Sequence, residues 1–150
     1  MEDKFSLINK TKGKIPLLPF VNMKNDILGK KYSLSFAYIS KVEMRKINKS
    51  YRNKDKATNV LSFQLSKNSG EILICPSVVK TETKKFERTY EQLLGFLVIH
   101  GMLHLKGMEH SSRMEEAETK YDQKYFYRNR HGLHHNKSGS GRIFKRRKKS

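Results

Sequence analysis

Three histidines lie close together in the sequence, at His100, His104 and His110. Side chains four residues apart share one face of an α-helix, so His100 and His104 can present both imidazole rings to a single ion. Gly107 lets the chain leave the helix with a positive φ, and the turn would bring His110 back towards the pair. Catalytic zinc is usually held by three protein ligands with an open fourth position. The spacing therefore predicts a metal site with these three histidines as its ligands, and Zn²⁺ is the ion usually held in this way.

The same histidine spacing occurs in the metzincin peptidases, whose pattern is H-E-x-x-H-x-x-G-x-x-H. In those enzymes the residue after the first histidine is a glutamate that acts as general base. Here that position is Gly101. A zinc peptidase of this type is therefore the disfavoured interpretation, because its proton acceptor is missing. The pattern favours a metal-dependent hydrolase of another kind.

The first two histidines belong to a helix that we expect to be buried. A capping box at Thr89 predicts its start, and the segment 93–105 is apolar almost all round, as in a central helix. Burying imidazole rings is unfavourable unless their nitrogens are bonded, and metal ligation satisfies one nitrogen of each ring. A further capping box at Ser112 predicts a charged last helix that ends near Tyr127.

Other elements follow from hydrophobic period and from turn residues. Strands are predicted at 5–8 (a short edge strand), at 32–38 (half-buried), and at 58–65 and 71–74 (a hairpin). Helices are predicted after Pro16 up to Gly29 with Pro19 in the first turn, from a cap at Ser40 to Tyr51, and from Pro76 to about Phe86.

The net charge of +18 points to a polyanionic partner such as nucleic acid. Residues 1–127 hold 23 basic and 14 acidic residues, a net charge of +9, and 128–150 hold nine basic residues and no acidic one. The plainer alternative is a Lys-rich surface that is only solvated. The pattern predicts one folded domain at 1–127 and a basic, disordered tail at 128–150.

Cysteine content and hydropathy indicate the cellular compartment of the protein. The single cysteine, Cys75, cannot form an internal disulfide, which fits a reducing environment. The longest apolar run, at 93–105, is too short to span a bilayer, and the amino end has no secretory signal pattern. We therefore expect a cytoplasmic protein without a membrane partner.

The histidine motif resembles the signature of the YbeY family of endoribonucleases, His-Gly-x-Leu-His-Leu-x-Gly-x-x-His. Further segments agree with that family in order and spacing across residues 40–115. They are Asn48-x-x-Tyr51-Arg52, Asp55, Thr58-Asn59-Val60-Leu61-Ser62-Phe63 and Gly70-Glu71-Ile72.

The resemblance implies a fold and an activity. The implied fold is a single α+β domain, with a small mixed β-sheet packed by helices around the metal-bearing helix. The implied activity is zinc-dependent endonucleolytic cleavage of single-stranded RNA, with no small-molecule cofactor. It also implies roles in ribosome quality control and in processing the 3′ end of 16S rRNA. The implied partners are rRNA and the small ribosomal subunit or its assembly factors.

By motif position, Arg52 corresponds to the family's functionally important arginine. We expect Arg52 and His100 to be catalytic, since a guanidinium can bind phosphate through two hydrogen bonds and offset developing charge. Lys54 and Lys56 either guide the RNA backbone or belong to a solvated loop. In the tail, the residues expected to bind RNA are Lys145, Arg146, Arg147, Lys148 and Lys149.

The chain departs from the family pattern at three acidic positions. Asn59, Glu71 and Glu109 stand where aspartate is usual. If these positions lie beside the metal, the changes would slow cleavage. They leave open an alternative, a ribosome-assembly or RNA-binding factor whose zinc is mainly structural.

Overall fold

The structure is a computed structural model that describes residues 4–127. Its strands are β1 (Phe5–Asn9), β2 (Ser33–Tyr38), β3 (Val60–Ser66) and β4 (Ser69–Ile74). Its helices are α1 (Phe20–Ile27), α2 (Lys41–Arg52), α3 (Pro76–Thr81), α4 (Tyr90–Leu105) and α5 (Ser112–Asp122), followed by the π-helical turn η1 (Gln123–Tyr127). The tail predicted at 128–150 lies outside the described residues.

The four strands form one mixed sheet in the order β1-β2-β4-β3. β1 and β4 both run parallel to β2, and β3 pairs antiparallel with β4 as a hairpin. The expected α+β class, the mixed sheet and the hairpin are therefore confirmed. β3 forms one edge of this sheet.

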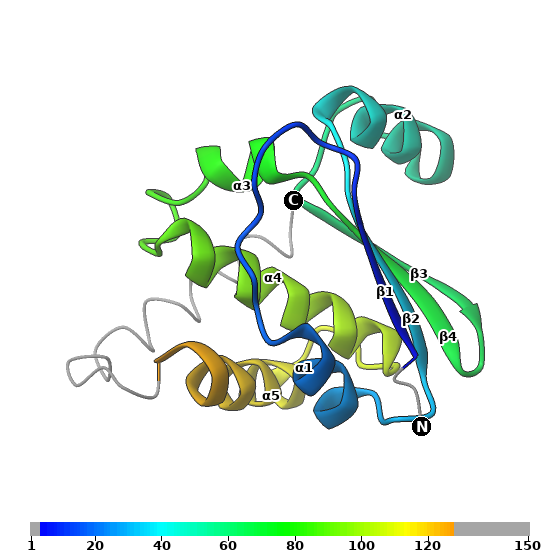
Figure 1. The fold of residues 1–150 in the computed structure, drawn as a ribbon, viewed down its shortest axis with the longest axis vertical. Coiled ribbons are helices and arrows are strands. Elements are labelled where there is room, and N and C mark those ends of the chain that lie inside the picture. Colours follow the sequence, from blue (N-terminus) through cyan, green and yellow to red (C-terminus); the bar gives the residue numbers. More distant parts are fainter. Residues whose placement is uncertain (1–3, 128–150) are drawn as a thin grey trace.

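Helices cover both faces of the sheet. Side chains alternate along a strand, so Phe36 of β2 faces the main core with α4, whereas Ala37 faces a smaller core that includes Met44 of α2. Figure 1 shows α1, α4 and α5 grouped together and α2 apart from them. The prediction of a half-buried strand at 32–38 is wrong at its end, because Phe36 and Ala37 are both buried.

Helix α4 is the central helix that the sequence predicts. Its capping box is present, with Thr89 Oγ1 accepting from the Gln92 amide and Thr89 N donating to the Gln92 side chain, both at 3.1 Å. Gly101 faces the sheet: a Cβ there would lie 2.9 Å from Ser62 Oγ and 3.2 Å from Ile72 Cδ1. Glycine thus allows the close approach of α4 to the sheet. None of the helices within residues 4–127 combines the length and apolarity needed to cross a membrane.

Three predicted helix ends are shifted. α3 ends at Thr81 and not near Phe86, because the Thr81 hydroxyl and the Glu82 amide bond to carbonyls three residues back and tighten the last turn. The cap of α5 is Ser111 and not Ser112, since Ser111 is extended and its Oγ accepts from the Met114 amide. Pro19 lies just before α1 instead of inside its first turn.

Candidate metal centre

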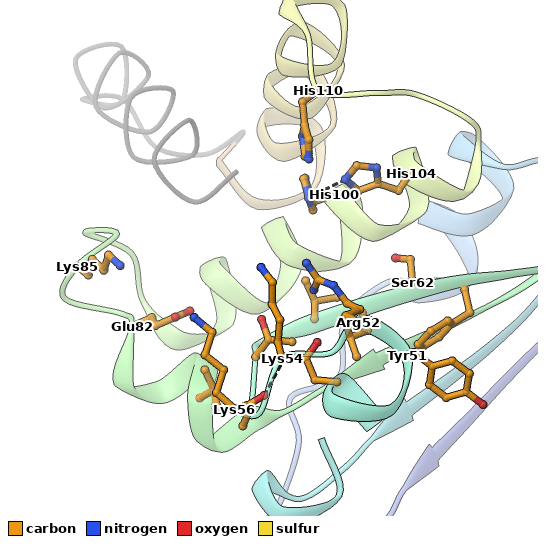
Figure 2. A pocket seen from close by; sticks show the side chains of 17 residues that line it. Tyr51, Arg52, Lys54, Lys56, Ser62, Glu82, Lys85, His100, His104 and His110 are labelled. Carbon is orange, nitrogen blue, oxygen red and sulfur yellow. Dashed lines mark hydrogen bonds between the residues drawn. The ribbon is translucent and has the colours of Figure 1, made fainter. Parts of the chain in front are cut away.

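The end of α4 and the loop after it bring three histidines together (Figure 2). His100 and His104 lie one turn apart on α4, with 3.1 Å between their Nε2 atoms. Gly107, with φ of 103°, turns the chain back so that His110 comes to lie beside them. The His110 ring centroid is 5.5 Å from that of His100 and 4.7 Å from that of His104. The predicted use of Gly107 as a turn is confirmed.

The three side chains fit a metal ion. One ring nitrogen of each histidine lies within 4.8 Å of the other two. Tetrahedral zinc at its usual Zn–N length of about 2.0–2.1 Å separates two nitrogen ligands by about 3.3 Å, close to the spacing of the His100 and His104 nitrogens. His100 is buried, His104 is half-buried and His110 is exposed. The site is therefore open to solvent on the side of His110.

A carboxylate from α5 contacts the buried histidine. Glu118 Oε2 lies 2.7 Å from His100 Nδ1, and Glu118 is 2% exposed. A carboxylate accepts a hydrogen bond at this distance, so Nδ1 carries the hydrogen and the Nε2 lone pair faces His104. Sequence reasoning missed Glu118. The available signal was its place four residues after Met114 on the buried face of an otherwise polar helix.

A second buried carboxylate lies one turn further along α5. Asp122 accepts a 3.0 Å hydrogen bond from Arg88, whose guanidinium also lies over the Phe96 ring. Burial raises the pKa of the Asp122 carboxyl to about 6, although the Arg88 charge opposes the shift. This pair ties α5 to the residue that precedes the α4 cap.

The histidines line a pocket of about 880 Å³. Ser62 faces α4, where its hydroxyl donates to the Gly101 carbonyl, while Phe63 contacts Tyr51 of α2. Side chains from both faces of β3 thus reach the pocket, which lies at the free edge of this strand. Figure 2 shows the side chains of Arg52 and Lys54 extending towards the histidines. Arg52 forms no ion pair with any residue in 4–127.

The loop after α2 holds two basic residues on the pocket wall. It begins at Asn53, which has a left-handed φ of 57°. The buried Asn48 side chain donates to the Lys56 carbonyl at 2.8 Å, and Arg45 binds Asp55 through two hydrogen bonds of 2.8 and 3.3 Å. Lys54 and Lys56 both line the pocket as a result.

Known proteins are similar to this chain in sequence and fold. A family model described as "Endoribonuclease YbeY" matches residues 14–130. The chain belongs to the YbeY family. The Staphylococcus saprophyticus endoribonuclease YbeY is 34% identical over 129 residues, which cover 78% of this chain and 80% of that protein.

Two further relatives agree. The Staphylococcus carnosus endoribonuclease YbeY is 38% identical over 97 residues, 57% of this chain and 63% of the relative. The match thus spans slightly less than two thirds of that protein. A solution structure from Thermotoga maritima has a TM-score of 0.58 and 30% identity, and it covers 80% of this chain and 87% of the other.

Two residues of the YbeY motif, Asn48 and Asp55, hold the loop that carries Lys54 and Lys56. Gly101, the residue that separates this motif from the peptidase pattern, has no room for a carboxylate on its sheet side.

The structure places the three positions at which Asn59, Glu71 and Glu109 replace the usual aspartates of the YbeY pattern. None of them is among the residues in 4–127 that line the pocket. The Asn59 side chain donates to Glu82 at 2.7 Å, Glu71 lies on β4, and Glu109 is exposed next to His110. The carboxylate that contacts a histidine ring of the site is Glu118 instead. The five basic tail residues expected to bind RNA lie outside the described range.

Proposed function

We propose that this protein is a metal-dependent endoribonuclease that cleaves single-stranded RNA. The observation that carries the proposal is the convergence of three histidine nitrogens at a pocket whose wall also presents Arg52, Lys54 and Lys56. Membership of a family described as endoribonucleases supports it. A site for a cation beside basic side chains suits a phosphodiester, because the phosphodiester is negatively charged and gains negative charge in the transition state.

His100, His104 and His110 would hold one Zn²⁺ ion. When bound, the ion would polarise a phosphoryl oxygen and lower the pKa of a coordinated water. Glu118 keeps the proton of His100 on Nδ1, which leaves Nε2 for the metal.

Arg52 binds a phosphate oxygen pair through its planar guanidinium and offsets charge as the bond breaks. Lys54 and Lys56 attract the flanking backbone as point charges. Their loop is held by hydrogen bonds to α2, so the backbone that carries these lysines is positioned before the substrate arrives.

The proposed substrate is the 3′ end of small-subunit 16S rRNA, with a further role in ribosome quality control in the cytoplasm. Small-subunit components or assembly factors would be the partners. The net charge of +18 supports an RNA partner, since phosphate contacts provide affinity without sequence information.

The alternative is an assembly factor with mainly structural zinc. The exposure of His110 and the open pocket beside it weigh against this alternative, because structural zinc sites are closed by four protein ligands. A peptidase is disfavoured, since Gly101 leaves no space for the usual general base.

The test is cleavage of a labelled single-stranded RNA that spans the 3′ end of the small-subunit rRNA. We expect wild type to cleave it, and a chelator or His104→Ala to abolish cleavage. Arg52→Ala should lose cleavage, and equal RNA binding by this variant and wild type would place Arg52 on the chemical step. Arg113→Ala is the matched control, because Arg113 is exposed on α5 and does not line the pocket. Cleavage that persists in folded His104→Ala protein would refute the metal-dependent mechanism.

A further inference from the structure

An exposed aromatic ring stands on the wall of the pocket. Tyr51, in the last turn of α2, is 72% exposed and lines the pocket next to Arg52. Single exposed aromatic residues are common on protein surfaces and need no special explanation. The surroundings of Tyr51 distinguish it from such a residue.

Phe63 of β3 supports the Tyr51 ring. The two ring centroids are 5.3 Å apart and the ring planes are inclined at 60°, an edge-on contact. Phe63 is partly buried and packs against the smaller core, which includes Met44 and Leu61. The Tyr51 ring therefore rests against an anchored neighbour, while most of its own surface still faces solvent. Such a supported ring loses little freedom when a flat ligand stacks on it.

Charge is distributed unevenly along the pocket. Figure 2 shows Tyr51 on one side of Arg52, with Lys56 and Lys85 on the other side. Glu82 is the acidic residue among the pocket-lining residues in 4–127, and its carboxylate accepts a hydrogen bond from the Asn59 amide. One end of the pocket thus has two lysines beside Glu82, and the other has an aromatic face next to Arg52. A single strand of nucleic acid has the same division between its phosphates and its bases.

We infer that Tyr51, supported by Phe63, is a stacking site for one unpaired base of a single-stranded nucleic acid whose adjoining phosphate lies at Arg52. The inference rests on the proposed function for the class of ligand. Stacking on an aromatic ring tolerates any base, because every base has a π-face. A duplex would keep its bases inside, so this site selects single strands.

The first test measures binding of the full-length, zinc-loaded protein to a fluorescent oligoadenylate at 4 °C, with a gel to check that the strand stays intact. We expect Tyr51→Ala to weaken binding by about 5- to 100-fold and Tyr51→Phe to stay within about two-fold of wild type. An oligomer of abasic sites keeps the phosphates without the bases, so Tyr51→Ala should bind it as wild type does. Leu17→Ala is the control, since Leu17 is 89% exposed and does not line the pocket.

Two results of that test would overturn the inference. Unchanged binding of oligoadenylate by Tyr51→Ala would show that no base stacks on the ring. If Tyr51→Ala weakened binding of the abasic oligomer as much as binding of oligoadenylate, Tyr51 would contact the phosphate backbone of the strand or support the protein fold.

The second test uses fluorescence, because the chain contains no tryptophan. Tyr51→Trp introduces a single reporter at the site, and a stacked adenine should quench it. The abasic oligomer should not. In Leu17→Trp protein the reporter should respond to neither oligomer. An unquenched reporter at position 51, or equal quenching at position 17, would contradict the stacking site.

Failure of the proposed function and failure of this inference give different results. If wild type does not cleave RNA but Tyr51→Ala still weakens binding of oligoadenylate alone, the stacking site stands without the nuclease. If wild type cleaves and Tyr51→Ala cleaves with unchanged KM and kcat, the nuclease stands and the stacking site falls. With both correct, Tyr51→Ala raises KM more than it lowers kcat.

Discussion

Glu118 Oε2 lies 2.7 Å from Nδ1 of His100, and both side chains are buried. This contact joins α5 to the ring of the site that lies deepest in the protein. It fixes the proton of His100 on the nitrogen that faces away from His104. The orientation of the buried ring is thus set by a helix that follows it in sequence.

Glu118→Ala is expected to reduce zinc affinity by about 10- to 100-fold, because outer hydrogen bonds to a ligand histidine typically contribute that much. The zinc affinity of Glu118→Gln should fall between those of Glu118→Ala and wild type, since its amide oxygen can still accept a hydrogen bond from Nδ1. A competition titration with a chromogenic chelator measures the affinity. Glu116→Ala is the control, because Glu116 is exposed on the same helix. Wild-type zinc affinity in folded Glu118→Ala protein would show that the contact does not orient the ligand.

Gly101→Ala should lower the free energy of unfolding by about 1–2 kcal/mol. The added methyl group would lie 2.9 Å from Ser62 Oγ, and overpacking of this kind outweighs the gain in helix propensity of alanine. Denaturant titration measures the change. Ser62→Ala in the same chain should recover part of the loss, as a double-mutant cycle can show. Gly13→Ala is the control, because a Cβ there meets nothing within 4 Å.

The buried Asp122 predicts a pH dependence of stability. Its folded-state pKa of about 6 lies above the ordinary value of 3.8, so the folded protein binds this proton more tightly than the unfolded chain does. The stabilisation from this group is therefore complete below pH 4 and is lost as the pH rises through about 6. The difference between the two pKa values corresponds to about 3 kcal/mol.

Comparison with Asp122→Asn isolates this contribution from other titrating groups. The free energy of unfolding of wild type minus that of the variant should fall as the pH rises from 4 to 7. Denaturant midpoints at each pH provide the measurement. A difference that rises with pH would mean that the Arg88 ion pair outweighs the cost of burial.

Deletion of residues 131–150 should weaken RNA binding and flatten its salt dependence. The segment carries seven Lys and Arg residues. If all seven contact phosphates of a single strand, the slope of log K against log salt would decrease by about 5. Titrations at several salt concentrations measure the slope. An identical slope in the shortened chain would make the tail irrelevant to RNA.

Much of the fold follows from local sequence. The period of two in Ser33–Tyr38, the capping box at Thr89 and the apolar circumference of α4 each specify an element without reference to the rest of the chain. The four-residue spacing of His100 and His104, with Gly107 after them, likewise defines most of the candidate metal centre. These features are readable because spacing within one helix or turn fixes which side chains are neighbours.

The tertiary structure decided the contacts between elements. Glu118 meets His100 across 18 positions, and Asn59 meets Glu82 across 23. Neither contact can be predicted from spacing, because each depends on how one helix packs against another element. The same packing explains why Gly101 must be small and why Tyr51 stands beside Phe63 at the edge of the sheet. The sequence by itself thus determined the spacing of the metal-binding histidines and the helix that carries two of them. Packing between elements determined which side chains surround them.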